Sequence, residues 1–295
     1  YQPVSSAAAF QLWLEDNDHP EDPMAEGDLG YREVVVITGG AGGIGQALAR
    51  RWSVAGARIA LLDLDAQALS HAAQELTATG ADVHVVQVDV TDFADCQRAM
   101  AAVVEHFGHI DVLVNNAGAV HRSAFCDTDI DVFRKVMEVN YFGSLHCARA
   151  ALPQLLQNRG LIVITSSIAG VAPLYGRSGY AASKHALHGL FESARTEQTE
   201  QGLRVKMDCP SYTRSAFEQH AMGADGQPAG TKRSMTGKLA EPDTVADAVV
   251  NAARRGRNLL VLSPLGKLSY YLSRLAPGFY ARGMLRRLRG GGPVR

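Results

Sequence analysis

Cysteine is scarce in this sequence, with four among 295 residues. They are Cys96, Cys126, Cys147 and Cys209. No two of them have C-x-x-C spacing, and none has a histidine at the spacing of a zinc site. This pattern argues against a disulfide framework and against a cysteine-based metal centre. We therefore predict a reduced, intracellular protein without a metal site.

Long apolar runs are also missing. No stretch reaches the roughly 18 residues that a membrane-spanning helix needs, and no secretory signal is visible. With 46% hydrophobic and 20% charged residues, the composition is typical of a soluble globular enzyme. A cytoplasmic location is the resulting expectation.

Each end of the chain lacks charge of one sign, although the formal net charge is only −1. Residues 1–28 contain seven carboxylates and no lysine or arginine, whereas the residues after Asp247 contain ten lysines and arginines and no acid. The middle of the chain is balanced and has no nucleic-acid-binding motif, so no nucleic-acid partner is expected. The chain starts at Tyr1, and Met24 is a plausible native start. Because residues 1–28 carry only negative charges, they are expected to be a poorly ordered acidic leader.

Short apolar, β-branched runs alternate with segments of helical spacing from Glu33 onward. Strands are predicted at Val34–Thr38, Arg58–Asp63, Val83–Asp89, Val112–Asn115, Leu161–Thr165, Leu203–Met207 and Leu259–Leu262. Helices are predicted at Gly43–Val54, Ala66–Thr79, Phe93–Phe107, Pro242–Ala253, across Asp129–Gln157 and across Tyr180–Gln201. This alternation predicts one α/β domain over residues 29–264, a doubly wound parallel sheet of about seven strands with helices on both faces.

A glycine-rich run over residues 38–45 follows the first predicted strand and opens the first helix. Glycines let the backbone turn tightly and approach a pyrophosphate, which the amides at the helix N-terminus then hold. The run satisfies two spacing templates, G-x-G-x-x-G (Gly40, Gly42, Gly45) and G-x-x-x-G-x-G (Gly39, Gly43, Gly45). In this strand–loop–helix context, either template predicts a dinucleotide site.

Asp63 ends the second predicted strand, 18 residues beyond Gly45. A carboxylate there can accept hydrogen bonds from the adenosine ribose and would repel a 2′-phosphate. No lysine or arginine in the glycine run or directly after Asp63 offsets that repulsion, so NAD is favoured over NADP. Asp63 could instead cap the following helix, a role compatible with ribose binding. The rival is an NADPH enzyme in which Arg50 or Arg51 reaches the 2′-phosphate.

Tyr180 and Lys184 are four residues apart in a predicted helix, so their side chains share one face. Lowering the pKa of a phenol from about 10 to about 7 requires about 4 kcal/mol. One cation about 4 Å away, at an effective dielectric near 20, supplies roughly that amount. Taken alone, the pair would also fit a surface tyrosine beside a helical lysine.

These features together resemble the short-chain dehydrogenase/reductase family. The resemblance rests on the glycine run, Asp63, Asn115-Asn116-Ala117-Gly118, Asn140, Ser167 and Tyr180-x-x-x-Lys184, and extends from about Glu33 to Ser215. It implies an NAD(P)-dependent oxidoreductase with a single Rossmann-type domain that forms a homo-oligomer (dimer or tetramer). The cofactor-binding residues that it implies, with NAD as the expected cofactor, are Thr38, Gly39, Gly43, Ile44, Gly45, Asp63, Asp89, Val90, Asn116, Ala117, Gly118, Tyr180, Lys184, Pro210 and Thr213.

The resemblance also implies catalytic roles for four side chains. Tyr180 would be the general acid/base, and Lys184 would lower its pKa and bond the nicotinamide ribose. Ser167 would hold the substrate oxygen, and Asn140 would position a water that links Lys184 to solvent. A phenolate is a competent base for the hydroxyl proton that leaves as hydride departs, and the Ser167 hydroxyl would stabilise charge on the oxygen.

One run departs from the family pattern. After the sixth predicted strand the family usually has Pro-Gly and then Thr, but here Ser211 follows Pro210. If that position needs φ > 0, a serine there would be strained. Either Thr213 or Ser215 would then meet the nicotinamide carboxamide.

Two segments outside the alternating pattern bear on the substrate and partners. The polar stretch 211–238 is expected to be a lid, or alternatively a disordered surface insert. The substrate pocket is expected to lie between the catalytic residues, residues 171–178 and this stretch. Its apolar lining is expected to include Val171, Ala172, Leu174, Tyr175, Tyr212 and Phe217, which favours a hydrophobic secondary alcohol or ketone. Residues 265–295 form a basic amphipathic extension, which would pack on its own domain or a partner subunit, or lie on anionic lipid.

The sequence thus predicts an NAD-dependent alcohol dehydrogenase or ketone reductase working in the oxidative direction, with a steroid-like, retinoid-like or fatty-acyl substrate. Two alternatives stay open, an NADPH-dependent carbonyl reductase and a non-catalytic NAD-binding regulator.

Overall fold

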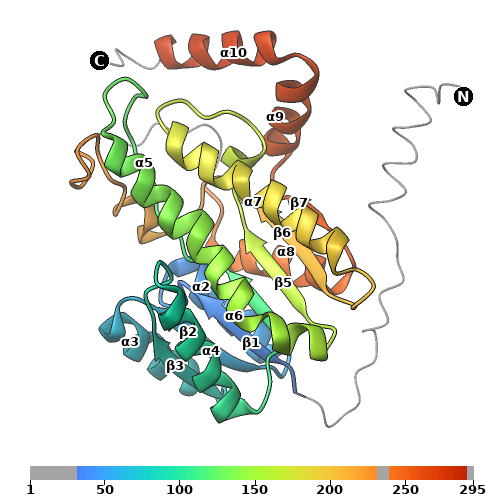
Figure 1. The fold of residues 1–295 in the computed structure, drawn as a ribbon. Coiled ribbons are helices and arrows are strands. Elements are labelled where there is room, and N and C mark those ends of the chain that lie inside the picture. The colour runs from blue at the N-terminus through green and yellow to red at the C-terminus, as the bar shows by residue number, and fades with distance from the viewer. Residues whose placement is uncertain (1–31, 231–238, 291–295) are drawn as a thin grey trace, which may run out of the picture.

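Seven parallel strands form one sheet in the computed structural model of this chain, which describes residues 32–230 and 239–290 (Figure 1). The strands are β1 (Val34–Thr38), β2 (Arg58–Asp63), β3 (Val83–Gln87), β4 (Val112–Asn115), β5 (Leu161–Thr165), β6 (Arg204–Cys209) and β7 (Leu259–Val261). Their order in the sheet is β3-β2-β1-β4-β5-β6-β7, and every pairing is parallel. The predicted α/β class and strand number are confirmed.

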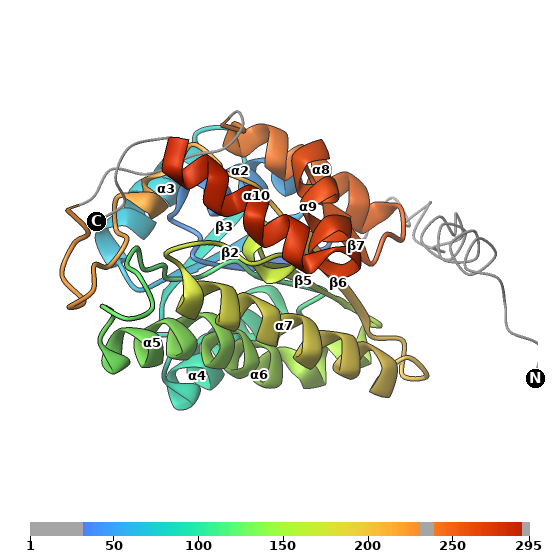
Figure 2. The ribbon, with the colours of Figure 1, turned by 90° about the horizontal axis from the view of Figure 1, so that it is seen from above.

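Helices cover both faces of the sheet, which is why the central strands are apolar throughout. All five residues of β1 are buried, and so are all five of β5. One core lies between the sheet and α4 (Phe93–Phe107), α6 (Gly143–Gln157) and α7 (Ser178–Glu197). The other lies between the sheet and α2 (Gly43–Val54), α3 (Ala66–Thr77) and α8 (Pro242–Arg254). Figure 2 shows α4, α6 and α7 on one side of the sheet and α2 and α8 on the other.

Several predicted elements differ from the structure by a few residues at their ends, for example β6 and α7, and two differences lie close to predicted site residues. The helix predicted across Asp129–Gln157 is interrupted, because a π-helical turn, η1 (Glu138–Phe142), separates α5 (Ile130–Met137) from α6. The third strand stops at Gln87, two residues early, because the Asp89 carboxylate accepts hydrogen bonds from the backbone and hydroxyl of Thr91 and closes a turn there.

The C-terminal extension forms two further helices, α9 (Pro264–Leu275) and α10 (Pro277–Gly290), separated at the predicted Pro277 break. Hydrogen bonds attach this pair to the loop after β5, one of them from the Ser273 hydroxyl to the Val171 carbonyl (3.3 Å). Arg274 donates to the Val171 carbonyl (2.7 Å), and the Tyr280 hydroxyl donates to the Pro173 carbonyl (3.0 Å). None of the helices in the described ranges is long and apolar enough to cross a membrane.

Some expectations concern residues outside the described ranges. The acidic leader 1–28, the part of the predicted lid at 231–238 and the last five residues, 291–295, all lie there.

Candidate active site

A cavity of about 690 Å³ opens at the carboxyl ends of β1, β2, β4, β5 and β6. The order of the strands reverses between β1 and β4, and in doubly wound sheets such a switch point is where ligands bind. Of the predicted site residues, the following line it: Gly39, Gly43, Ile44, Asp63, Asn116, Gly118, Ser167, Tyr180, Lys184, Pro210 and Thr213. The tertiary fold thus brings most of the predicted site together.

The glycine loop is packed too closely to accept side chains at two of its positions. Gly39 has φ +63°, and a Cβ there would lie 2.9 Å from the Ala117 Cα. A Cβ on Gly45 would lie 2.2 Å from the Gly39 carbonyl oxygen. Because the loop folds back on itself this tightly, the N-terminus of α2 at Gly43 faces the cavity directly. The G-x-x-x-G-x-G spacing therefore has a steric reason.

Asp63 lines the cavity and also holds the glycine loop in place. Its Oδ2 accepts a hydrogen bond from the Ala41 amide (3.1 Å), and its Oδ1 accepts one from the Asp65 amide (3.3 Å). The idea that Asp63 caps the next helix is wrong, because Asp65 is the N-cap of α3 and accepts from Gln67 and Ala68.

The two arginines considered for a 2′-phosphate are engaged elsewhere. Arg50 pairs with Asp243 at 2.8 Å and Arg51 pairs with Asp247 at 2.6 Å, both on α8. Neither arginine lines the cavity.

Five residues of the predicted cofactor set do not line the cavity, namely Thr38, Gly45, Asp89, Val90 and Ala117. Thr38 is buried, and its hydroxyl accepts hydrogen bonds from the Asn116 and Ala117 amides (3.0 Å each), joining β1 to β4. Thr38 therefore supports the loops that line the cavity rather than facing it. The carboxylate of Asp89 accepts the hydrogen bonds from Thr91 described above.

Three of the four predicted catalytic residues share the cavity wall, and Asn140 lies behind it. Asn140 is fully buried in the π turn. Its side-chain amide donates to the Ala119 carbonyl (2.9 Å) and the Ser183 hydroxyl (2.8 Å), and its oxygen accepts from the Ala119 amide (2.7 Å). The prediction that Asn140 positions a water between Lys184 and solvent stays a prediction.

Burial and neighbouring groups act on the pKa of Tyr180 in opposite directions. Burial raises the pKa of Tyr180 to about 12, although a hydrogen bond with Ser167 and the charge of Arg177 lower it. Burial also lowers the pKa of Lys184 to about 8. The Lys184 ammonium donates to the Thr165 carbonyl (2.8 Å) and lies 5.9 Å from the centre of the Tyr180 ring. Desolvation is thus the largest influence on the Tyr180 phenol in the protein alone, and the lowering of its pKa by Lys184 stays a prediction.

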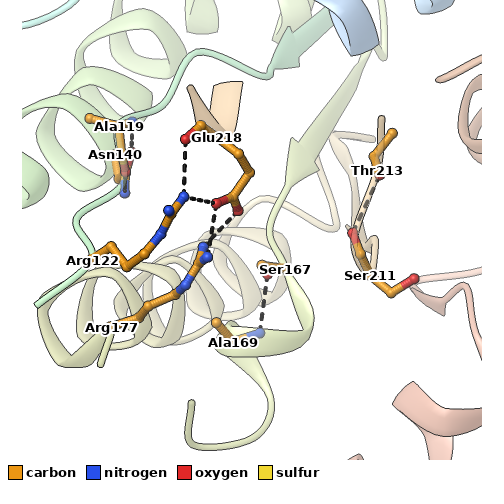
Figure 3. Close-up of polar contacts among 9 residues, drawn as sticks. All are labelled: Ala119, Arg122, Asn140, Ser167, Ala169, Arg177, Ser211, Thr213 and Glu218. Carbon is orange, nitrogen blue, oxygen red and sulfur yellow. Dashed lines mark hydrogen bonds and ion pairs between the residues drawn. The ribbon is translucent and has the colours of Figure 1, made fainter. Parts of the chain in front are cut away.

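The run after β6 is not strained by its serine. Arg159 is the one non-glycine residue with positive φ in the described ranges, so Ser211 keeps an ordinary backbone. The Thr213 hydroxyl donates to the Ser211 carbonyl at 3.3 Å (Figure 3). Both Thr213 and Ser215 line the cavity.

The predicted substrate lining is partly wrong. Leu174, Tyr212 and Phe217 line the cavity, but Val171 and Ala172, which follow the 3₁₀ turn η2 (Ile168–Gly170), are buried, and Val171 packs against Cys209 and Val261. Tyr175 is 44% exposed.

Sequence reasoning missed a charged cluster in the wall. Arg177 and Arg122 both converge on the carboxylate of Glu218, in the turn η3 (Ala216–Glu218) (Figure 3). Arg177 stands three residues before Tyr180, which is the one sequence signal that could have drawn attention to it.

Comparison with known proteins agrees with this geometry. A family model described as short chain dehydrogenase matches residues 33–224. The chain is 38% identical over 264 residues to dehydrogenase/reductase SDR family member 7B of Bos taurus, covering 87% of this chain and 81% of that protein. It is 35% identical to the Mus musculus protein of the same name, with 87% and 81% coverage.

Solved structures show the same fold. A short-chain dehydrogenase/reductase from Burkholderia phymatum in complex with NAD superposes with a TM-score of 0.75 at 25% identity, covering 84% of this chain and 95% of that one. An alcohol dehydrogenase from the archaeon Thermococcus sibiricus complexed with 5-hydroxy-NADP gives 0.69 at 26% identity, with 79% and 96% coverage.

The chain therefore belongs to the short-chain dehydrogenase/reductase family of oxidoreductases. Its sheet, with the cavity at the switch point, is that of a Rossmann-type fold.

Proposed function

We propose that this protein transfers a hydride between NAD(H) and a hydrophobic secondary alcohol or ketone, with Tyr180 as the general acid/base. The observation that carries the proposal is the single cavity in which Tyr180, Lys184 and Ser167 face the glycine loop. A dinucleotide fits this loop because the backbone around Gly39 and Gly45 leaves no room for side chains and turns the α2 N-terminus toward the cavity.

When bound, the nicotinamide ring accepts or supplies the hydride. Ser167 holds the substrate oxygen, and Tyr180 takes the hydroxyl proton during oxidation or returns it during reduction. Lys184 supplies positive charge at the cavity wall, where it favours the phenolate form of Tyr180. Asn140 sits behind Lys184 and positions a water for proton exchange with solvent.

The preference for NAD rests on Asp63. Its carboxylate lines the cavity, and a 2′-phosphate beside it would be repelled. The pairing of Arg50 and Arg51 with α8 weakens the NADPH alternative, in which one of them neutralises that phosphate.

The substrate is proposed to be apolar along most of its length. Leu174, Tyr212 and Phe217 provide the apolar wall, and Ile168 extends it. A steroid-like, retinoid-like or fatty-acyl alcohol fits such a wall. Assembly as a dimer or tetramer is likewise a proposal, since it follows from family resemblance.

The location is proposed to be the cytoplasm, with a peripheral contact at a membrane surface. The C-terminal helices support the membrane contact. Exposed apolar side chains on α9 and α10 are Leu268, Leu275, Phe279 and Leu285. Residues 264–290 carry basic residues and no acid. Apolar groups among cations suit a surface of anionic lipid.

Vesicle binding tests this contact. The protein should sediment with mixed phosphatidylcholine/phosphatidylserine vesicles at low salt, and the double variant Leu275→Glu/Phe279→Glu should bind less. Val54→Glu, which changes an exposed apolar residue on α2, is the matched control. Failure of the unaltered protein to bind these vesicles would exclude the contact.

Nicotinamide absorbance tests the proposed activity. The purified protein is mixed with NAD⁺ or with NADP⁺ and a panel of hydrophobic secondary alcohols. We expect turnover with NAD⁺, and Tyr180→Phe should still bind NADH while losing nearly all turnover. A substantial residual rate in Tyr180→Phe would remove Tyr180 as the base, and absence of nucleotide binding would refute the whole proposal.

A further inference from the structure

A partly buried ion-pair cluster stands beside Tyr180, and the roles proposed above do not use it. Arg177 forms a bidentate ion pair with Glu218, with N–O distances of 2.7 and 2.8 Å. Arg122 donates to the Glu218 carboxylate (3.0 Å) and to its backbone carbonyl (3.1 Å). A buried charge pair of this kind is costly to desolvate and is weak evidence for stability alone. Its place in the cavity wall suggests a functional reason.

Arg177 is fixed in position relative to Tyr180. It is 5% exposed and is the N-cap residue of α7, where its carbonyl accepts the Ala181 amide (2.8 Å). Tyr180 follows three residues later, in the first turn of α7. Both side chains line the cavity, as does Glu218. The bidentate pair holds the guanidinium in one place, so its field at the phenol is constant.

Other groups also face Tyr180 or its neighbours. On α7 itself these are Arg177 and Lys184, the loop after β5 contributes Ser167, η3 contributes Glu218 and β6 contributes Cys209. His121 and Tyr212 also interact electrostatically with Arg177, and the His121 ring accepts a hydrogen bond from the Gly179 amide (2.9 Å) beside Tyr180. Burial and the charge of Arg177 lower the pKa of His121, which favours its neutral form.

Arg177 and Glu218 act on Tyr180 with opposite signs. The positive charge of Arg177 lowers the pKa of Tyr180 and the negative charge of Glu218 raises it. Because they are bound to each other, their fields partly cancel, and the balance depends on which charge is nearer the phenol.

We propose that Arg177 is a positioning residue that favours the phenolate of Tyr180, and that Glu218 holds Arg177 in place while opposing its charge. The proposal rests on the proposed role of Tyr180. The Arg177–Glu218 pair then adjusts the pH at which Tyr180 works as a base. Glu218 lies in η3, which is remote in sequence from the Tyr-x-x-x-Lys motif.

The test is the pH dependence of kcat/KM for alcohol oxidation in two variants that break the same ion pair. Arg177→Gln should move the midpoint of the acid limb upward, and Glu218→Gln should move it downward, each by about one pH unit, as expected for the loss of one neighbouring charge. The double variant loses both charges, whose effects on Tyr180 have opposite signs, so its midpoint should return close to that of the unaltered protein. Arg177→Lys keeps the cation and should restore most of the shift.

Arg122→Gln is the matched control. Arg122 contacts the same Glu218 oxygen as Arg177 does but does not line the cavity. We expect a smaller shift of the midpoint than in Arg177→Gln. A role limited to holding η3 would lower the rate in all of these variants without moving the midpoints in opposite directions, and that result would overturn the proposal.

A second readout does not require turnover. Tyrosine labelled with ¹³C at Cζ reports ionisation directly, and the Tyr180 signal is assigned as the one missing in Tyr180→Phe. Titration with and without NAD⁺ should show the same opposite shifts. Opposite shifts without any turnover would refute the proposed function alone, whereas an unshifted signal in both variants would refute the role of the ion pair.

Discussion

Asp63 offers a quantitative test of cofactor choice, because its two roles can be separated. Its carboxylate accepts the Ala41 and Asp65 amides, and each oxygen keeps a further lone pair for the ribose of a bound nucleotide. A hydrogen bond to a charged acceptor is worth about 1.5–3 kcal/mol. At 1.4 kcal/mol per tenfold change, its loss weakens NADH binding roughly ten- to a hundredfold.

Asp63→Asn removes the charge and keeps an oxygen that can accept the Ala41 amide. We therefore expect weaker NADH binding, with NADPH binding unchanged or tighter because one like charge is gone from beside the 2′-phosphate. Asp63→Ala also loses the loop contact, so it should weaken binding of both nucleotides.

The assay is the fluorescence of NADH and NADPH titrated with each variant, expressed as the ratio of the two Kd values. Asp65→Asn is the matched control, since it removes a neighbouring carboxylate from the same cavity wall and asparagine still caps α3. An unchanged Kd ratio in Asp63→Asn would show that this carboxylate does not select the nucleotide.

Two further predictions concern stability and pH. Gly45→Ala should cost more than about 2 kcal/mol and abolish NADH binding, because its Cβ would lie 2.2 Å from a backbone oxygen, whereas Gly189→Ala, with open space around the Cβ, should stabilise α7 by up to about 1 kcal/mol. Equal thermal shifts in the two variants would contradict the steric argument. Burial raises the pKa of Asp208 from 3.8 to about 7, so the folded state holds its proton more tightly and loses free energy of unfolding as pH rises from about 4 to 7. Asp208→Asn lacks this dependence and should gain stability relative to the unaltered protein between pH 4 and pH 8 in urea titrations; a difference that is the same at both pH values would refute the assignment.

Much of the fold could be predicted because its signals are local. Each strand is a short apolar run, and the glycine run and Tyr180-x-x-x-Lys184 have fixed spacings that fall on one turn or one helix face. The π turn that contains Asn140 could not be predicted from the sequence, since such a turn adds one residue to a helical turn without changing the composition.

The sequence by itself determined the α/β class, the glycine-rich loop between β1 and α2, the tyrosine and lysine on one helix face, and the family. Tertiary structure alone decided that Tyr180 is buried, which raises its pKa, and that Thr38 supports the loops instead of facing the cavity. It also decided that Glu218 meets Arg177, 41 residues earlier, and Arg122, 96 residues earlier. Periodicity reports which face of an element is buried, but desolvation and the pairing of charges from distant turns exist only after the chain has closed around them.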